Sequence, residues 1–529
     1  MRSLFARLHR RYGKKIVGSR RQAMVRAKIG AEAGQVAVAR TLEVAASVAG
    51  ARPRVAIIGA GFGGLMTGYM LTPRCDVTIF EARDRVGGRV WSKSKSSGIV
   101  EAGAELIGYN HPLWLCLARD FELGLSVNTS DTNFEALHLE MPLYLDGSKI
   151  QERKQKKLYK EMDKCLAQMT KDAAAIDTDR PWDVKGAERL DNTSVAKWIS
   201  DLGLQDNLVE SALRQQFEND GGVPCEEQSY LANLTVIKGG ELEDDPGAFF
   251  TQSENLRCSS GNQALADCLA ATIRERGGII HQLSPVNAID IEADKVTVGA
   301  DGRSSQAFDY VVLAIPPSLW PGKRFARLEI TPKLPNGYYV SMGRAVKYLS
   351  PLKKRFWIRD GFAPIATSTE FGVTWEGTDN QIAAPGRDVE LSLFAGANAA
   401  DTALAAWRAG GSRAVDEFYA AEIGSVYPGY KSNLTQQPEF MAWPEDPWTG
   451  ASYSCLAPGE VRRAGPLLAK GFQKRMFFAG EHTCFAYMGY MEGALQSGCK
   501  AAEAVLNAAA RESARNPSRA TKKRATSRR

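Results

Sequence analysis

The chain has 529 residues, of which 44% are apolar, a composition that allows a large buried core and more than one domain. No uninterrupted apolar run is long enough to cross a bilayer, which argues against a transmembrane segment. The net charge of +7 is uneven: residues 1–54 carry a balance of +11, residues 511–529 carry +7, and the body between them carries −11. An acidic body with basic ends argues against a nucleic-acid groove, so no specific nucleic-acid partner is expected.

Residues 1–52 are expected to form a basic helical extension that packs on the body. Arg20 and Arg21 loosely resemble a twin-arginine export signal, but charged residues interrupt the stretch that should be apolar. The nine cysteines show no C-x-x-C pair and no regular spacing, which indicates reduced thiols. We therefore expect a cytoplasmic protein, with export as the alternative if the Arg20-Arg21 region acts as a degenerate signal.

The run VAIIGAGFGGL, which begins at Val55, combines an apolar strand, a glycine-rich turn and a helix. Gly59, Gly61 and Gly64 allow a tight turn, close approach of the backbone to a pyrophosphate, and close packing of the helix. A second apolar strand ends at Glu81, whose carboxylate is placed to accept hydrogen bonds from an adenosine ribose. Because strand, turn, helix and acid coincide, we predict a dinucleotide cofactor rather than an ordinary glycine-rich turn.

The continuation EARDRVGGR favours FAD over a nicotinamide cofactor. Two further glycines let the backbone pass close to the cofactor, Arg83 lies in the same cofactor-binding run, and Arg89 supplies a planar cation that can face a phosphate or the flavin edge. The segment from Gly59 to Ser92 resembles the first motif of the flavin-dependent amine oxidase family, which includes monoamine, polyamine and L-amino-acid oxidases.

The middle of the chain is expected to be helical first and then to alternate helix and strand. Helices are predicted over residues 149–175, 194–217 (with an N-cap near Thr193) and 261–276, and strands over residues 286–289, 295–298 and 310–315. This order resembles the second cofactor-binding segment of the family, in which a residue placed like Val286 packs against the adenine end of FAD.

A third segment lies near the C-terminus, where a short strand over residues 475–478 leads to Glu481 and a new helix begins at about Met491. Amides at a helix N-terminus suit the negative charge that develops at the flavin N1 and O2 edge on reduction. Both features resemble the family pattern and follow the family's order, so the resemblance covers most of the chain.

These segments imply an α/β fold with a dinucleotide-binding, glutathione-reductase-like FAD domain assembled from discontinuous segments and an inserted α+β substrate domain. The FAD-binding domain is expected to comprise residues 53–112, 256–330 and 440–508, and the substrate domain residues 113–255 and 331–439. Residues 509–529 are expected to form a basic, disordered tail.

Three residues match catalytic positions of the family. Tyr453 and Tyr490 stand where the family places an aromatic pair beside the flavin, which would steer an amine toward the ring and exclude water. Lys347 precedes a Phe-Trp pair at the family's spacing. The resemblance implies that this lysine holds a water near flavin N5 and assists the reaction with oxygen.

Other positions depart from particular subfamilies. Ser452 stands where certain monoamine oxidases carry the cysteine that attaches flavin covalently, so noncovalent FAD is expected. The arginine with which several amino-acid oxidases bind a substrate carboxylate is missing, and Arg344 is the substitute we consider. Glu105 would favour a cationic substrate if it reaches the pocket, and is otherwise a hydrogen-bonded carboxylate at the flavin edge. Trp375 is expected to line the same pocket. None of the five histidines shows a metal-ligand spacing, so no metal is predicted.

The resemblance implies FAD-dependent oxidative deamination of a small amine or L-α-amino acid. Hydride transfer to flavin N5 would give an imine that water hydrolyses, and O2 would reoxidise the flavin with formation of hydrogen peroxide. Three alternatives stay open: an amino-acid monooxygenase that decarboxylates its substrate to an amide, an FAD-dependent desaturase or dehydrogenase of an apolar substrate, and a binding protein with a structural flavin. The sequence does not determine the oligomeric state, and a homodimer is one candidate.

Overall fold

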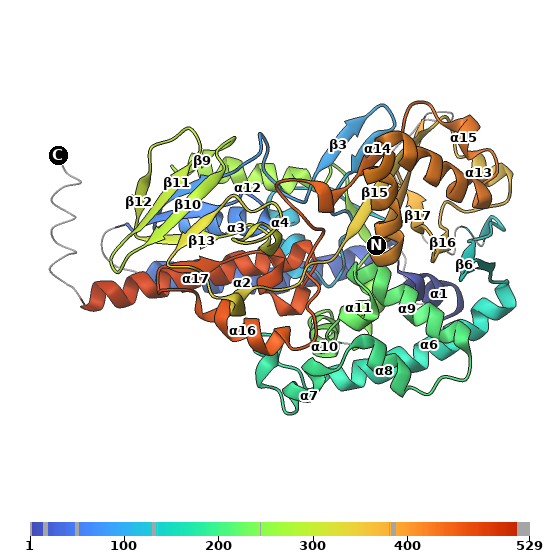
Figure 1. Cartoon of the computed structure of the whole chain (residues 1–529), viewed down its shortest axis with the longest axis horizontal. Helices are drawn as coiled ribbons and strands as arrows, with labels where there is room; N and C mark the ends of the chain where they lie inside the picture. Colours follow the sequence, from blue (N-terminus) through green and yellow to red (C-terminus); the bar gives the residue numbers. More distant parts are fainter. Residues whose placement is uncertain are drawn as a thin grey trace.

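The computed structural model describes residues 3–13, 20–47, 52–129, 134, 136–243, 245–379, 381 and 388–515. Figure 1 shows its layers: helices enclose a small sheet at one end, a long helix covers a larger sheet at the other end, and a group of helices lies below their junction. The chain passes between these layers several times, so each layer is built from segments that are far apart in the sequence.

A five-stranded sheet with the order β20-β13-β1-β2-β9 forms the centre of the first layer. Its strands are β1 (Arg54–Ile58), β2 (Asp76–Phe80), β9 (Ile279–His281), β13 (Tyr310–Leu313) and β20 (Met476–Phe478). Every neighbouring pair is parallel. Continuous apolar runs suit these strands, because helices cover both faces of a parallel sheet. The predicted dinucleotide-binding fold, assembled from discontinuous segments, is confirmed.

The helices that cover this sheet come from the same segments as its strands. They are α3 (Phe62–Leu71), α12 (Gln263–Glu275) and α17 (Met491–Arg515). α3 packs against both of the others. A four-stranded sheet with the order β12-β11-β10-β14 belongs to the same end of the molecule, and consists of β10 (Val286–Ile291), β11 (Val296–Ala300), β12 (Gln306–Phe308) and β14 (Glu329–Thr331).

The second layer is a seven-stranded mixed sheet with the order β19-β15-β18-β17-β16-β6-β7. Its strands are β6 (Leu143–Leu145), β7 (Ser148–Lys149), β15 (Ala345–Leu352), β16 (Thr367–Ser368), β17 (Gly372–Glu376), β18 (Val389–Gly396) and β19 (Glu439–Met441). β15 and β18 are buried along their whole length, and α14 (Ala397–Val426) packs on both. Two short helices, α13 (Phe356–Arg359) and α15 (Tyr430–Asn433), lie at this end of the molecule (Figure 1).

A group of helices completes the α+β substrate part. It comprises α6 (Glu152–Ala173), α7 (Ala187–Asn192), α8 (Val195–Asp201), α9 (Asn207–Gly221), α10 (Tyr230–Gly239) and α11 (Ala248–Gln252), with α16 (Glu460–Lys470) beside them. The single helix expected over residues 194–217 is two helices, because Gly203 interrupts it with a φ of 59°. Ser194, not Thr193, caps the first by accepting from the Lys197 amide at 3.0 Å, and Asp206 caps the second.

Two helices precede the first strand, α1 (Leu4–Tyr12) and α2 (Arg20–Ser47). α2 packs along α4 (Pro112–Asp120) and α17, whereas α1 buries its apolar side chains among α6, α9 and α11. The backbone amide of Ser3 donates to Glu254 at 3.1 Å, and that of Phe5 donates to Gln216 at 2.8 Å. The N-terminal segment is therefore part of the packed body.

Two expected boundaries differ from the structure. α4 was assigned to the substrate domain, but its apolar side chains share a core with β1, α3 and α17, so this helix belongs to the cofactor side. The tail expected from residue 509 is helical as far as Arg515, because α17 continues through an alanine-rich stretch. Residues 516–529, which carry the rest of the expected tail, lie outside the described residues.

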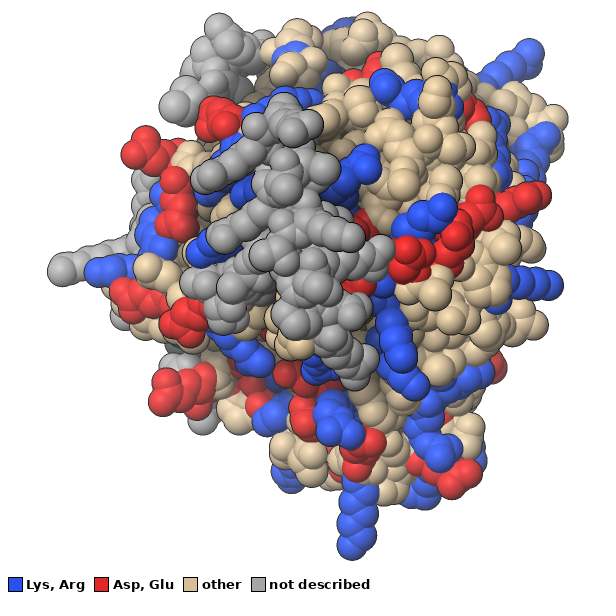
Figure 2. Space-filling view, turned by 90° about the vertical axis from the view of Figure 1, so that its left-hand side faces the viewer, with Lys and Arg blue, Asp and Glu red and all other residues tan. Residues whose placement is uncertain are grey.

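The surface offers no segregated charge on the face shown in Figure 2. There, the side chains of Lys and Arg are interspersed with those of Asp and Glu. Within the described part of the chain, every helix is too short or too polar to span a membrane.

The turn after β1 yields a stability prediction. A Cβ at Gly64 would lie 2.0 Å from the carbonyl oxygen of Gly59, whereas a Cβ at Gly61 would meet nothing within 4 Å. We expect Gly64→Ala to lower the free energy of unfolding by about 1–3 kcal/mol, since a backbone contact cannot relax as a side chain can. Gly61→Ala should leave it unchanged. Denaturant unfolding of both variants checks this, and equal stabilities would contradict it.

Candidate active site

A large cavity lies at the carboxyl ends of β1, β2, β13 and β20. In parallel α/β sheets this edge is where ligands bind, because loops and helix N-termini converge there. The cavity also reaches β15 and β17 of the seven-stranded sheet. All the residues that sequence analysis selected line it except Arg344 and Gly64, and Gly64 packs α3 against the preceding turn.

Glu81 lies at the end of β2, beside the glycine turn. Its carboxylate accepts hydrogen bonds from the backbone amides of Ala60 at 2.7 Å and Arg83 at 2.9 Å. Burial raises its pKa, and these two amide bonds oppose that rise. The amide of Gly59 donates to the carbonyl of Phe80 at 2.8 Å, which holds the turn against β2. Glu81 is thus fixed beside the turn with capacity for a further donor, as ribose binding requires.

The Arg83 side chain is held by a residue that sequence analysis missed. Its guanidinium forms a bidentate pair with Asp446 at 2.6 and 3.1 Å and donates to Thr449 at 3.0 Å. In the sequence, Trp448 stands between Asp446 and Thr449. Its ring stacks under Arg327, whose guanidinium carbon is 4.8 Å from the ring centroid. No spacing rule marks Asp446, Trp448 or Arg327 in the sequence, since they come from segments more than a hundred residues apart.

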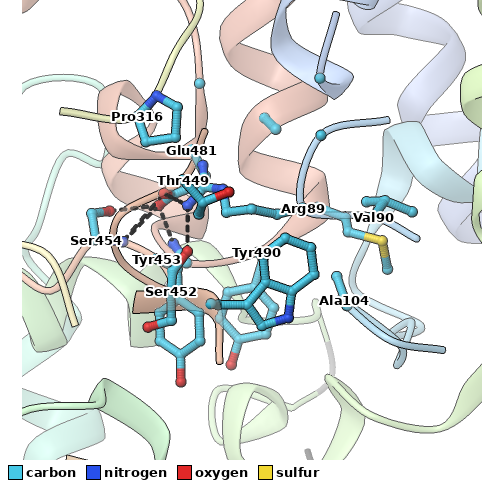
Figure 3. A pocket seen from close by; sticks show the side chains of 18 of the residues that line it. Arg89, Val90, Ala104, Pro316, Thr449, Ser452, Tyr453, Ser454, Glu481 and Tyr490 are labelled. Atoms are coloured by element: carbon cyan, nitrogen blue, oxygen red, sulfur yellow. Dashed lines mark hydrogen bonds and ion pairs between the residues drawn. The ribbon is translucent and has the colours of Figure 1, made fainter. Parts of the chain in front are cut away.

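Glu481 joins the remaining cofactor segments (Figure 3). Its buried carboxylate accepts from Arg89 at 2.8 Å, from the hydroxyl and amide of Ser454, and from the amide of Gly489 at 2.8 Å. Arg89 also donates to the carbonyl of Ser452 at 2.8 Å. Burial alone would raise the pKa of Glu481, but the Arg89 charge and the other polar contacts of the carboxylate, including the hydrogen bonds from Ser454 and Arg89, together outweigh burial and lower it. Glu481 therefore acts as an ionised centre that fixes both loops.

The cavity fits FAD in several independent respects. The space beyond Gly61 is open, so the backbone there can approach a pyrophosphate closely. α17 begins at Met491, and Met491 and Ala494 from its first turn line the cavity, which places a helix N-terminus against the ligand. Val286, at the start of β10, lines the same cavity and is 9% exposed. Ser452 offers no thiol for covalent attachment.

Tyr453 and Tyr490 project into the cavity next to each other (Figure 3). The Tyr453 ring lies over Gly489, where a Cβ would be 3.4 Å from it, and its hydroxyl donates to the carbonyl of Asp220 at 2.9 Å. Tyr490 packs edge-on against His111, with ring centroids 5.4 Å apart. Burial raises the pKa of both tyrosines well above the ordinary value, so both hydroxyls stay neutral. The two rings form an uncharged aromatic slot.

Lys347, on β15, lines the cavity from the side of the seven-stranded sheet. Its ammonium group donates to the carbonyl oxygens of Glu101 at 2.7 Å and Gly103 at 3.2 Å, and to Glu105 at 2.6 Å. Trp375 donates its indole N–H to Glu105 at 2.8 Å. The structure therefore brings the three predicted residues Lys347, Glu105 and Trp375 into one cluster, and Glu105 lies there as a hydrogen-bonded carboxylate.

Two acidic residues that sequence analysis did not select also line the cavity, namely Asp220 and Glu254. Gln216 donates to one oxygen of Asp220, while the other oxygen is buried and has no hydrogen-bond partner among the described residues. Burial, together with the nearby charge of Glu254, raises the pKa of Asp220 to about 8. Because the Tyr453 hydroxyl bonds to the Asp220 backbone, this carboxyl lies at the hydroxyl end of the slot.

Arg344, considered as a partner for a substrate carboxylate, is not in the cavity. Its guanidinium forms a bidentate pair with Asp401 of α14 at 2.8 and 3.0 Å, and the residue itself stands directly before β15. Among the described residues, no group of His, Cys, Asp and Glu side chains has the geometry of a metal site.

Comparison with known proteins agrees with this geometry. Residues 62–506 match the family described as flavin containing amine oxidoreductase. The flavin-containing amine oxidase A of Bos taurus is 24% identical over 486 residues, which cover 87% of this chain and 86% of that protein. A probable flavin-containing monoamine oxidase A of Dictyostelium discoideum is 24% identical and covers 85% of this chain and 97% of its own length.

Solved structures share the fold. Cyclohexylamine oxidase from Brevibacterium oxydans IH-35A superposes with a TM-score of 0.70 at 20% identity, over 86% of this chain and 99% of that one. Putrescine oxidase bound to putrescine superposes with a TM-score of 0.70 at 20% identity, over 85% of this chain and 98% of that one. Because the family match spans most of the chain and the cavity fits the cofactor, this protein belongs to the flavin-containing amine oxidoreductases and uses FAD.

Proposed function

We propose that this protein oxidises a primary or secondary amine, with noncovalent FAD as the cofactor and O2 as the final electron acceptor. When bound, FAD accepts a hydride from the carbon next to nitrogen and passes the electrons to O2, which becomes hydrogen peroxide. The observation that carries the proposal is the aromatic slot of Tyr453 and Tyr490, which opens into the same cavity as the glycine turn and Glu81.

The residues that line the cavity orient the amine and exclude water from it. The faces of Tyr453 and Tyr490 offer π-electron density to an amine and restrict it to one approach, and their neutral state adds no charge that would hold the amine protonated. Lys347 places a positive charge at the cavity wall, where negative charge that develops during reaction with O2 would be stabilised. Water then hydrolyses the released imine to a carbonyl compound and an amine or ammonia.

The charges in the cavity favour an amine over an L-α-amino acid. Near the slot, the lining cations Arg89 and Lys347 each form an ion pair with a glutamate, so neither is available to a substrate carboxylate. Asp220 and Glu254 place two acidic groups at the hydroxyl end of the slot instead, and Asp220 gains its negative charge above about pH 8. An amine that carries a second ammonium group would match this end best.

We also propose a reducing, cytoplasmic location, which the absence of disulfides among the nine cysteines supports.

Anaerobic titration of the FAD-loaded protein tests the proposal. We expect small monoamines and diamines to bleach the oxidised flavin absorbance, and the L-amino acids to leave it unchanged, because Arg89 and Lys347, the described cations near the slot, are each paired with a glutamate. Bleaching by L-amino acids alone would overturn the substrate class, and bleaching by none of these compounds would overturn the function. Mass spectrometry of the aerobic product separates deamination from a monooxygenase, which would release an amide. Turnover with a quinone but not with O2 would identify a dehydrogenase.

The glycine turn separates cofactor binding from folding. We expect Gly61→Ala to raise the dissociation constant of FAD by about tenfold or more, because the added methyl group projects into open cavity space that the pyrophosphate would occupy. Its circular dichroism spectrum and unfolding midpoint should match those of the parent protein. Quantitative FAD titration of the apoprotein measures the effect. Unchanged FAD affinity would show that the pyrophosphate does not pass this turn.

The carboxyl of Asp220 gives a prediction for specificity. The raised pKa means that Asp220 is neutral below about pH 8 and charged above it. The ratio of kcat/KM for a diamine to that for a monoamine of similar length should therefore rise through this range. In Asp220→Asn the ratio should be flat and about tenfold lower above the transition. Glu210→Gln, on the exposed side of α9, serves as the control. A pH-dependent ratio that survives in Asp220→Asn would exclude this role.

A further inference from the structure

Lys347 is a buried cation with all its donors in use. The residue is 4% exposed, and an ammonium group carries three N–H bonds. Two of these reach the carbonyl oxygens of Glu101 and Gly103, and the third reaches Glu105. Among the described residues this accounts for every hydrogen on the ammonium group, so the Lys347 side chain is held in one position at the cavity wall.

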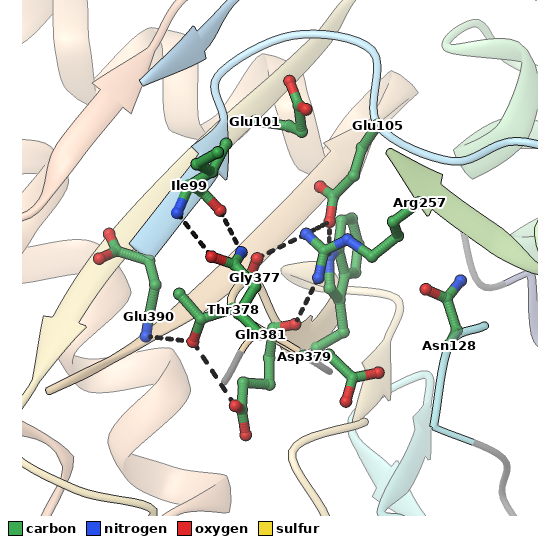
Figure 4. Close-up of polar contacts among 12 residues, drawn as sticks. Ile99, Glu101, Glu105, Asn128, Arg257, Gly377, Thr378, Asp379, Gln381 and Glu390 are labelled. Atoms are coloured by element: carbon green, nitrogen blue, oxygen red, sulfur yellow. Dashed lines mark hydrogen bonds and ion pairs between the residues drawn. The ribbon is translucent and has the colours of Figure 1, made fainter. Parts of the chain in front are cut away.

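Glu105 is the buried anion that completes this arrangement. One carboxylate oxygen accepts from Lys347, and the other accepts from Trp375 at 2.8 Å and from Arg257. Arg257, on β8 (Leu256–Cys258), also donates to the carbonyl oxygens of Gly377 and Glu376, which fixes its guanidinium behind the cavity wall (Figure 4). Burial alone would raise the pKa of Glu105, but the Arg257 and Lys347 charges outweigh burial and hold it at about 2.

We propose that Glu105 is a positioning residue that holds the Lys347 ammonium group at the cavity wall, so that the positive charge of Lys347 acts in the reaction with O2. This inference rests on the proposed function, which assigns the cavity to FAD and O2. The Glu105 carboxylate accepts three hydrogen bonds and the Lys347 ammonium group donates three, which leaves neither side chain free to move.

The other charged groups around Lys347 cannot replace Glu105. The Glu101 carboxylate points away from the ammonium group, accepting from Ser92 and the Asn262 amide, and burial raises its pKa to about 7. Arg257 carries the same charge as Lys347. Without Glu105, the buried cations Lys347 and Arg257 would lie close together, and no described carboxylate would contact either of them. Such an arrangement favours loss of the lysine proton at alkaline pH.

The test follows how fast the reduced holoenzyme reacts with O2 as the pH changes. Flavin reduced by dithionite, without any amine, is mixed with O2 in a stopped-flow instrument between about pH 6 and pH 10. We expect the parent rate to vary by less than about twofold, and the Glu105→Gln rate to fall by about tenfold or more toward alkaline pH. The absorbance spectrum of the oxidised holoenzyme should shift over the same pH range in Glu105→Gln only, which gives a readout independent of turnover.

Four further variants assign the effect. The reduced Lys347→Met variant should react slowly with O2 at all pH values. The rate of the double variant with Glu105→Gln should show no pH step, because the titrating group is then absent. Glu105→Asp keeps the charge and should keep the flat profile. Glu390→Gln removes a buried glutamate that pairs with Lys95 at 3.1 Å outside the cavity, and should behave as the parent does.

Two results would overturn the inference: a tenfold alkaline fall already present in the parent protein, or a pH step that persists in the double variant. The parent measurement needs no variant to fold. Since dithionite supplies the electrons, the outcome does not depend on finding an amine substrate, so a failure of the proposed substrate class and a failure of the Glu105 role are distinguishable.

Discussion

The buried carboxylate of Glu481 is the interaction on which the cofactor site depends. An ionised carboxylate is costly in a protein interior unless it is paired and hydrogen-bonded, and here the partners are Arg89, Ser454 and Gly489. They come from the loop after β2, from the segment that carries Tyr453, and from the turn before α17. Satisfying one charge therefore brings three remote parts of the chain together, and it sets the position of both tyrosines.

A second buried carboxylate, Glu105, plays the corresponding role on the opposite wall. It connects a residue of β15 with residues of β8 and β17, so the seven-stranded sheet is tied to the cofactor layer by charge as well as by apolar packing. The two networks differ in which groups they hold in place. Glu481 fixes backbone and so defines shape, whereas Glu105 fixes a lysine at the cavity surface and so defines the local electrostatic field.

Local signals in the sequence were sufficient for the parallel sheet and the residues at its edge. A glycine turn and an acid after an apolar strand are short-range features, so the positions of Gly59, Gly61, Glu81 and Met491 followed directly from the sequence. The positions of Asp446, Arg257 and Asp220 in the site did not, because these residues reach their partners by tertiary contact across a hundred or more residues. The break at Gly203 was missed for a related reason: helix periodicity continues on both sides of it. The roles of the selected residues in catalysis stay predictions.

The strand order β20-β13-β1-β2-β9 has a consequence for biosynthesis. The ribosome delivers β1 and β2 early, but β20 and the start of α17 are made last among the elements of this layer. Until then the nascent chain exposes an unpaired strand edge at β13, and no complete binding site exists for the flavin. The cofactor layer can therefore close and bind the flavin only once β20 and the start of α17 have left the ribosome, and its earlier strands must avoid aggregation until then.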